Sequence, residues 1–241
     1  MAEPQLGPMV PDIPAIPPTH KILTGRTVTL EPLSPAHSSD LFACLGGAEN
    51  ARIWDYMSDG PFFDEPTFAN YISKLAQSQN PLFFAIIDHH SSNNNPGSSI
   101  SSRQATGLIS LMRIDIPNRV VEIGYVTFSS LLRRTTAATE TIYLLLRWVF
   151  EELHFRRCEW KSNDLNGASK RAAERLGFVF EGLFRQHMIR KGRNRDSAWF
   201  SMLDGEWEGG VKRAFEGWLD EGNFDGEGRQ KRGLEEFRQV N

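Results

Sequence analysis

Apolar residues recur along the chain with two different spacings, and each spacing predicts a different kind of element. Alternation of apolar and polar residues, or a short apolar run between breaker residues, is typical of β-strands. Seven strands are expected on this basis, at residues 28–32, 82–88, 105–115, 120–128, 156–162, 178–192 and 195–204. The segments 105–115 and 120–128 form a predicted antiparallel pair, and the last two segments a predicted hairpin that turns around Gly192-Arg193-Asn194.

A spacing of three or four residues between apolar positions predicts the helices. The longest helix is expected at residues 138–153, where this spacing is kept by Ala138, Ile142, Leu145, Val149 and Leu153. Three shorter helices are expected to begin at the cap residues Ser34, Asp64 and Asn166. The inner stripe of the last helix is expected to consist of Ala168, Ala172 and Leu176.

Strands and helices are mixed along the chain, which predicts one domain of the α/β or α+β class rather than a helical bundle or a β-sandwich. The domain is expected to span residues 21–206, with a flexible hairpin insertion at 89–104 that is rich in Ser, Asn and Gly. Residues 1–20 contain six prolines and are expected to form an extended arm. The charged segment 207–241 is expected to hold a weak helix near 211–219 and then to be disordered.

The composition changes this picture little but excludes several classes of protein. With 40% hydrophobic residues, 24% charged residues and a net charge of −3, the chain is typical of globular proteins and has no global attraction for nucleic acid. The two cysteines lack the spacing of a disulfide framework or a metal site, and no apolar run approaches the ~18 residues of a membrane span. A cytoplasmic protein without a metal or a membrane partner is therefore expected, as a monomer or a homodimer.

The stretch "LLRRTTAATE" at residues 131–140 joins a predicted strand to the long predicted helix. The first N–H groups of a helix have no partner within it, and the helix dipole adds a partial positive charge there. The residues at this turn are small enough for a phosphate to approach the backbone, and Arg133 and Arg134 can balance its charge. A helix capped by Thr136, with both arginines solvated, explains the same letters, so both interpretations stay open at this point.

This stretch, followed by a strand and by "NGASKRAAERLGF" at 166–178, resembles the GCN5-related N-acetyltransferases, and among them the branch similar to ribosomal-protein N-acetyltransferases. The resemblance covers residues 21–206. It implies a mixed, mostly antiparallel twisted sheet that splays between two central strands, with helices on both faces. It also implies direct transfer of an acetyl group from acetyl-CoA to a primary amine, without an acyl-enzyme and without a metal.

In this family the pyrophosphate loop has the pattern Q/R-x-x-G-x-G/A, which falls here on Arg133, Thr136 and Ala138. Thr136 departs from the usual glycine, which would crowd the approach of the backbone to the phosphates. By the resemblance, the acetyl-CoA site consists of Val126, Thr127, Phe128, Arg133, Arg134, Thr135, Thr136, Ala137, Ala138, Thr139, Asn163, Asn166 and Ser169. A backbone N–H around residues 126–128 is expected to meet the developing oxyanion.

Three side chains are candidates for proton transfer. Glu122 aligns with the strand glutamate that is the general base in histone-modifying members of the family, and alternation places it on one face with Gly124 and Val126. His187 competes as the base, because the ordinary pKa of histidine is near 6.5. Ser169 aligns with the proposed proton donor to the leaving thiolate. Each also has a structural interpretation, as an edge-exposed glutamate, a structural histidine and a serine in the first helical turn.

The sequence does not identify the acceptor amine, since a small molecule and a protein N-terminus present the same nucleophile. Trp54 and Tyr56 are candidates to line its pocket. Met188 stands where the ribosomal-protein branch has a glutamate, so that particular base is missing. Together with Thr136, this departure motivates one alternative, a member of the fold that binds acyl-CoA without catalysis.

A nucleic-acid-binding module is the second alternative, because "RQHMIRKGRNRD" carries Arg185, Arg190, Lys191, Arg193 and Arg195. This hairpin tip lacks the aromatic residues that would stack on bases. Its basic side chains are therefore expected to hold substrate or to be solvated, and no nucleic-acid partner is expected.

Overall fold

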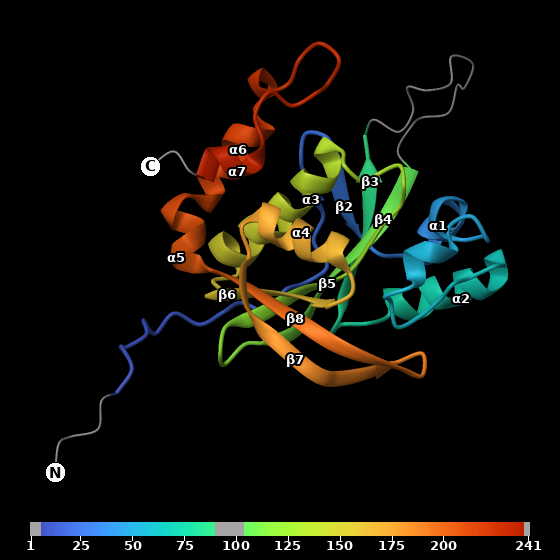
Figure 1. Cartoon of the computed structure of the whole chain (residues 1–241), viewed down its shortest axis with the longest axis horizontal. Coiled ribbons are helices and arrows are strands. Elements are labelled where there is room, and N and C mark those ends of the chain that lie inside the picture. Colours follow the sequence, from blue (N-terminus) through green and yellow to red (C-terminus); the bar gives the residue numbers. More distant parts are fainter. Residues whose placement is uncertain (1–5, 90–103, 239–241) are drawn as a thin grey trace.

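The structure, a computed structural model, describes residues 6–89 and 104–238, and its framework is one twisted sheet of eight strands (Figure 1). The strand order across the sheet is β1-β2-β3-β4-β5-β6-β8-β7. Neighbouring strands are antiparallel except β5 and β6, which are parallel. The strands are β1 (Leu23–Thr24), β2 (Val28–Pro32), β3 (Leu82–Asp88), β4 (Gln104–Asp115), β5 (Val120–Phe128), β6 (Arg157–Asn163), β7 (Val179–Arg190) and β8 (Arg193–Leu203).

Helices cover both faces of this sheet (Figure 1). On one face lie α3 (Thr136–Arg147), α4 (Gly167–Leu176), α6 (Lys212–Leu219) and α7 (Leu234–Arg238), and on the other α1 (Ser38–Leu45) and α2 (Glu65–Ala76). Shorter helical segments are Pro35–His37, Ala51–Trp54, Trp148–Glu152, α5 (Asp204–Glu206), Trp207–Val211 and Glu221–Asn223. The mixed architecture, the mostly antiparallel sheet and the helices on both faces confirm the predicted fold class.

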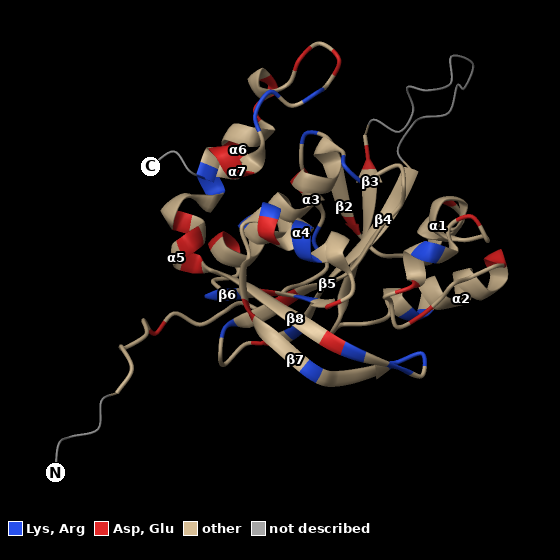
Figure 2. Cartoon of the chain, in the orientation of Figure 1, with Lys and Arg blue, Asp and Glu red and all other residues tan. Residues whose placement is uncertain are grey.

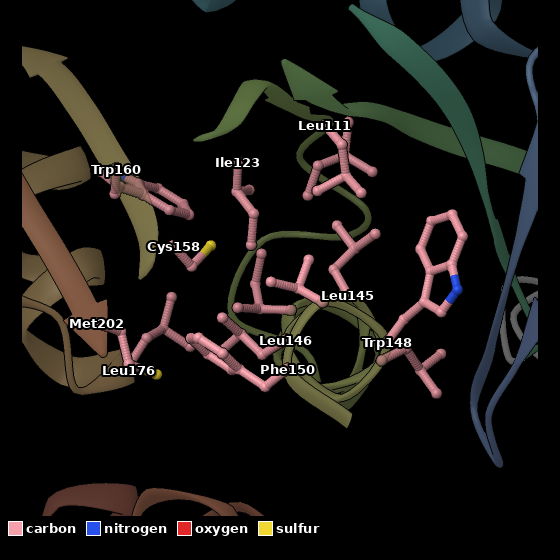
Figure 3. Packing of buried hydrophobic residues seen from close by; sticks show 14 of the residues in the cluster. Leu111, Ile123, Leu145, Leu146, Trp148, Phe150, Cys158, Trp160, Leu176 and Met202 are labelled. Carbon is pink, nitrogen blue, oxygen red and sulfur yellow. The ribbon is translucent and has the colours of Figure 1, made fainter. Parts of the chain in front are cut away.

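The larger hydrophobic core lies between the sheet and α3 (Figure 3). Leu145 and Leu146 of α3 and Phe150 of the following turn meet Ile123 of β5 and Cys158 of β6. Each of these side chains is buried, and burial of one such group stabilises the fold by roughly 1.5–3 kcal/mol. This core therefore fixes the long helix against the two central strands.

The two central strands part after a short parallel pairing. The register partners of β5 and β6 end at Glu122 and Glu159, although β5 continues to Phe128 and β6 to Asn163. Beyond that point β5 keeps only β4 as a neighbour, and β6 keeps only β8. The predicted splay is confirmed, and one row of β5 backbone groups faces the gap instead of a partner strand.

A β-bulge interrupts β5 inside the splay. Between the register partners of Gly124 and Thr127, β5 advances by three residues while β4 advances by two. Tyr125 takes a left-handed φ of 50° at this place. An extra residue in one strand of an antiparallel pair bends that strand and breaks its alternation.

The bulge reassigns the last residues of β5 to the opposite faces. Val126 and Phe128 contact the core under α3, as Ile123 does, whereas Tyr125 contacts the smaller core under α1 and α2. The prediction that Glu122 shares a face with Val126 is therefore wrong. Simple alternation fails here because the bulge adds one residue between them.

The C-terminal segment is ordered further than the sequence predicted. The expected helix near 211–219 is present as α6, but the chain after it does not become disordered before Arg238. Trp207, Phe215, Trp218 and Leu234 are all buried in the larger core. The high charge of the segment suggested that the entropic cost of ordering it would dominate. Burial of the apolar area of these four side chains outweighs that cost.

The N-terminal arm has neither helix nor strand from residue 6 to 20, as the prolines predict. Its second half lies on the domain, because Ile16 donates a backbone hydrogen bond of 2.8 Å to the carbonyl of Leu153, and Ala15 is buried. Residues 90–103 lie outside the described residues, so the structure does not describe the insertion that the sequence predicts at 89–104. The closing hairpin turns at Lys191 and Gly192, two positions with left-handed φ, slightly before the predicted place.

Candidate active site

A cavity of about 1590 Å³ opens where β5 and β6 part. Its wall comes from β5 and β6, the start of α3, α4, the β7–β8 hairpin, the segment before α2 and the C-terminal segment. The volume exceeds the ~300–1,000 Å³ of a common small-molecule site, which leaves room for an extended ligand and a second molecule. Its described lining contains eleven lysines and arginines and three carboxylates, a composition that favours anionic ligands.

The N-terminal end of α3, which we call the α3 mouth, forms part of this wall. Thr135 is the N-cap, since its Oγ1 accepts a 3.1 Å hydrogen bond from the N–H of Ala138. The N–H of Thr135 itself donates to the carbonyl of Leu132. The structure thus corrects the interpretation of Thr136 as the cap. Of the donors at this helix start, the N–H groups of Thr136 and Ala137 have no partner within residues 6–89 and 104–238 and remain available to an anion.

The loop before α3 accommodates Thr136 without backbone strain. Thr136 is already helical, and the left-handed conformation in this loop is taken by Arg134, with a φ of 66°. Arg133 donates from Nε to the carbonyl of Phe128 at 2.9 Å, which ties the loop to the end of β5. Both arginines line the cavity. Arg133 therefore shapes the loop, while the exposed Arg134 is left to meet a charge.

The opposite wall is formed by the β6–α4 connection. Asn166 caps α4, because its Oδ1 accepts a 3.1 Å hydrogen bond from the N–H of Ser169. Asn163 fixes the turn before it by accepting from the N–H of Leu165 at 3.0 Å. Ser169 accepts a 3.0 Å hydrogen bond on Oγ from the indole N–H of Trp160. The structure brings these predicted residues together with the α3 mouth around one cavity.

α4 presents small side chains to this cavity. Ala168 and Ala172 line it, whereas Ala173 and Leu176 are buried in the core. The predicted inner stripe is thus correct only for Leu176. The buried face of the helix is rotated by about one residue from the predicted face. The sequence did not distinguish the two faces, because alanines with helical spacing lie on both of them.

Glu122 is buried and paired with two cations. Its Oε2 lies 2.9 Å from Nζ of Lys161 and 3.1 Å from Nε of Arg113, and its side chain is 7% exposed. Burial raises the pKa of the Glu122 carboxyl above its ordinary value, against the opposite effect of the Lys161 and Arg113 charges. The edge-exposed interpretation is therefore wrong. A Cβ on Gly124 would lie 2.3 Å from Sδ of Met112, so Met112 fills the space expected beside Glu122.

His187 also lines the cavity, from β7. Its Nδ1 lies 2.9 Å from Oγ of the buried Ser197. Burial, and after it the charges of Arg113 and Arg195, lower the pKa of His187 below its ordinary value. The ring is therefore neutral at pH 7, and when Nδ1 donates to Ser197, Nε2 is left as a proton acceptor.

Of the two aromatic residues predicted to line the acceptor pocket, only one lies at the cavity. Trp54 is fully buried between the helices of the smaller core, where its indole N–H donates to the carbonyl of Leu45 at 2.8 Å, and it does not line the cavity. Its prediction as a pocket residue is wrong, because the aromatic side chains of Phe62 and Phe68 enclose it. Tyr56 does line the cavity, and its hydroxyl donates to the carbonyl of Leu165 at 3.2 Å.

Sequence reasoning missed Lys161. Regular alternation with the buried Cys158 and Trp160 would put Lys161 on the solvated side of β6, but its side chain is only 5% exposed. It lies over the ring of Trp199, with Nζ 3.7 Å from the ring centre, because Trp199 is its register partner on β8. Only the strand order of the sheet reveals this contact, and no local motif signals it.

The C-terminal segment supplies another wall that was missed. Trp218, Phe224 and Arg229 line the cavity, and the guanidinium of Arg175 lies 5.0 Å from the ring of Trp218. The helical spacing of the aromatic residues Phe215 and Trp218 was the signal in the sequence. That spacing did predict the helix near 211–219, but the high charge of the residues after it led to the prediction of disorder there, so Phe224 and Arg229 were missed.

The basic residues of the β7–β8 hairpin lie at its tip and along both strands (Figure 2), and their side chains do not share one environment. Arg190 and Arg195 line the cavity, and Lys191 donates from Nζ to the carbonyl of Trp54 at 2.8 Å. Arg185 and Arg193 are exposed. The basic side chains that motivated the nucleic-acid alternative thus differ in their surroundings: some line the cavity, one contacts a backbone carbonyl and others face solvent.

Within residues 6–89 and 104–238, no cluster of three or more His, Cys, Asp or Glu side chains has an arrangement that could hold a metal ion. In the same part of the chain, no helix has the length and apolar character needed to cross a membrane.

Comparison with known proteins agrees with this geometry. A family model described as an acetyltransferase (GNAT) domain matches residues 27–179. A GCN5-related N-acetyltransferase from Brucella melitensis is 43% identical, with a TM-score of 0.87 over 94% of this chain and 98% of its own. A probable GNAT-family acetyltransferase from Chromobacterium violaceum is 36% identical, with a TM-score of 0.72 over 86% of this chain and 100% of its own.

A curated relative is the "Putative ribosomal N-acetyltransferase YdaF" of Bacillus subtilis (strain 168), which is 34% identical over 103 residues. The match covers 43% of this chain and 56% of that relative, so the chain spans little more than half the length of the relative. The family match covers more than half of this chain, and the similarity to the Brucella protein extends over nearly all of it. The chain therefore belongs to the GNAT family of acetyltransferases.

Proposed function

We propose that this protein transfers the acetyl group of acetyl-CoA directly to a primary amine. The observation that carries the proposal is the cavity between the parted strands β5 and β6, which begins at the two unpaired N–H groups of the α3 mouth. Membership of the GNAT family and the similarity to N-acetyltransferases support the same activity.

The residues around the α3 mouth fit the diphosphate of acetyl-CoA. The N–H groups of Thr136 and Ala137 and the positive end of the α3 dipole suit an anion, and Arg134 adds a full charge. The gap between β5 and β6 suits an extended arm, because unpaired strand backbone offers hydrogen bonds to amides along its length. The backbone N–H groups of residues 126–128 are our candidates for stabilising the oxyanion.

When bound, acetyl-CoA supplies a thioester whose carbonyl carbon forms a bond to the amine nitrogen while its bond to sulfur breaks. The amine must first lose a proton, since an ammonium has no lone pair. We assign this proton to His187, because a neutral imidazole with a free Nε2 can accept it at pH 7. Both cysteines have pKa values raised by burial, to about 11 for Cys44, which agrees with a route that uses no thiol nucleophile.

Glu122 is assigned a positioning role in this scheme. Its carboxylate is already held by Lys161 and Arg113, and taking a proton would leave Arg113 without a carboxylate partner and Lys161 with Glu159 alone. It thus fixes the two cations near the cavity rather than receiving the proton of the amine.

Ser169 is our candidate for protonating the leaving thiolate. Its Oγ accepts from Trp160, so its own hydroxyl proton is free to point into the cavity. The proton balance is then complete, since one group accepts a proton from the amine and another supplies one to sulfur.

The test combines binding and turnover. Titration calorimetry should detect acetyl-CoA binding, and release of free thiol from acetyl-CoA should require an added amine. A panel of amino acids, amino alcohols, polyamines and peptides with free N-termini covers the acceptor classes. Binding without amine-dependent thiol release across the panel would instead support the non-catalytic acyl-CoA-binding alternative.

A further inference from the structure

Four basic side chains line the part of the cavity around His187, where the charge of each acts on the imidazole, and we call them the inner basic cluster. They are Arg113 of β4, Lys161 of β6, Arg190 of β7 and Arg195 of β8. Two of them contact Glu122 at the point where β5 and β6 begin to part. This point is six residues of strand from Phe128, or roughly 20 Å from the loop that leads to the α3 mouth. The cluster therefore lies far from the proposed diphosphate site.

The carboxylates of the protein neutralise only part of this cluster. Arg113 pairs with Glu122, and Lys161 pairs with Glu122 and Glu159. Within residues 6–89 and 104–238, neither Arg190 nor Arg195 has a carboxylate within 4.0 Å. This part of the cavity thus carries an excess of positive charge.

One hydrogen-bond donor of each of these two arginines is also unsatisfied. The Nε groups of Arg190 and Arg195 are both buried and have no hydrogen-bond partner in the described part of the chain. Arg190 also donates from Nη1 to the carbonyl of Ile189 over a long 3.4 Å, and from Nη2 to Sδ of Met188 at 3.4 Å, a weak acceptor. A buried charged donor without a partner costs stability, and folded proteins rarely keep one without a reason.

A bound anion is the simplest reason for both observations. Guanidinium groups bind carboxylates and phosphates through two parallel hydrogen bonds, and a pair of such groups suits one anion. Arg190 and Arg195 both line the cavity that also holds His187, so the anion would belong to the molecule whose amine loses its proton.

We infer that the acceptor is a primary amine that carries a negatively charged group, a carboxylate or a phosphate, which Arg190 and Arg195 bind. This inference rests on the function proposed above and names the substrate class of that same site. It also says which amines the site rejects, because polyamines and lysine-rich segments would bring further positive charge to the inner basic cluster. The cluster aids the reaction as well, since nearby cations favour the neutral form of the amine.

Two pairs of acceptors test the charge requirement and distinguish its two sources. For small molecules, O-phosphoethanolamine is compared with ethanolamine. For peptides, Ala-Asp-Ala amide is compared with Ala-Asn-Ala amide. In at least one pair, the anionic member should have the higher kcat/KM by about tenfold or more, the effect of one hydrogen bond to a charged group. Equal kcat/KM within both pairs would overturn the inference, while thiol release with any of these amines would leave the proposed function standing.

Arg190→Gln and Arg195→Gln should remove this preference: kcat/KM should fall about tenfold or more further for the anionic acceptor than for the neutral one, whose rate loses only the effect of the cations on the amine and on His187. Arg193→Gln is the matched control, since it removes the same charge from the exposed end of the same hairpin and does not line the cavity. The affinity for acetyl-CoA should stay constant in all three variants. A parallel loss of acetyl-CoA affinity would assign the arginines to the cofactor and overturn the inference.

Folding of the variants is checked by their melting temperatures. Because each glutamine variant removes a buried donor that has no partner, neither should melt earlier than Arg193→Gln does. If one of them fails to fold, Arg195→Lys keeps the charge but loses the planar fork of donors, and it should keep only part of the preference. Full preference in the lysine variant, or in a folded glutamine double variant, would contradict recognition by these guanidinium groups.

Discussion

The indole N–H of Trp160 donates a 3.0 Å hydrogen bond to Oγ of Ser169. A serine hydroxyl has one proton and two acceptor positions, so this contact occupies an acceptor position and leaves the proton free. Trp160, on β6, packs in the larger hydrophobic core. Its indole therefore fixes the position of the Ser169 hydroxyl at the cavity wall. The arrangement suits a proton donor better than a simple first-turn serine, whose hydroxyl would rotate freely.

Ser169→Ala should lower kcat with little change in the KM for acetyl-CoA, because only the departure of the thiolate needs the proton. A general acid commonly contributes ~10²–10⁴-fold, and replacement by water would reduce the observed loss toward the lower value. Steady-state kinetics with acetyl-CoA varied provide the measurement, and Ser169→Thr, which keeps a hydroxyl, is the control. Equal loss in both variants would show that the size of the side chain, rather than its proton, is what matters.

The lowered pKa of His187 predicts where the rate falls with acid. The neutral ring is the active form, so kcat/KM should keep its full His187 contribution down to the ordinary histidine pKa near 6.5 and lose it only at lower pH. The acceptor amine adds its own dependence at higher pH, so the readout is one extra unit of slope in log kcat/KM below that value. His187→Gln should remove the extra slope, and the exposed His154→Asn should keep it. An extra slope that begins above pH 6.5 would contradict the assignment.

The α3 mouth can be tested by charge. Thr136→Glu places a carboxylate beside the two unpaired N–H groups, where it competes with the diphosphate and repels it. Binding of acetyl-CoA should weaken by at least about tenfold, as a like charge in such a site costs on the order of 1–2 kcal/mol or more. The melting temperature of this variant should not fall, since an acidic residue at a helix start is favourable. Thr136→Gln is the uncharged control, and an unchanged Kd in the glutamate variant would remove the loop from the site.

Glu140 provides a test of stability near the same helix. Its carboxylate on α3 accepts hydrogen bonds of 2.7 Å from the N–H groups of Arg26 and Thr27, and it is 7% exposed. Glu140→Ala leaves two backbone donors without a partner and should lower the free energy of unfolding by about 2–4 kcal/mol. The exposed Glu208→Ala should change it by less than about 0.5 kcal/mol in the same denaturant titration. Similar values for both variants would mean that water replaces the lost contacts.

The sequence predicted those parts of the fold that depend on local patterns. The hairpin strands β4 and β5, the start of α2 at Asp64 and the start of α4 at Asn166 were all found where spacing and caps placed them. The mouth of α3 was also found, because a strand, a run of small residues and a helical period signal it together. These features need no knowledge of distant partners.

The missed features depend on contacts between distant segments. The burial of Lys161 follows from its position opposite Trp199, and that of Trp54 from helices that enclose it. The unsatisfied groups of Arg190 and Arg195 become visible only when four strands converge on one cavity. A charged residue in a strand pattern is expected in solvent, and only the complete sheet shows that it faces an enclosed space.

The extra residue at Tyr125 has a practical meaning for anyone who engineers this protein. Side chains at even and odd positions of β5 change faces of the sheet at that point. A substitution chosen by counting every second residue from Glu122 therefore lies on the opposite face beyond Gly124. Deleting one residue there would restore regular pleating and turn the side chains of Val126 and Phe128 out of the core beneath α3. The bulge therefore lets Val126 and Phe128 pack beneath the long helix while the strand lines the cavity on both sides of Gly124.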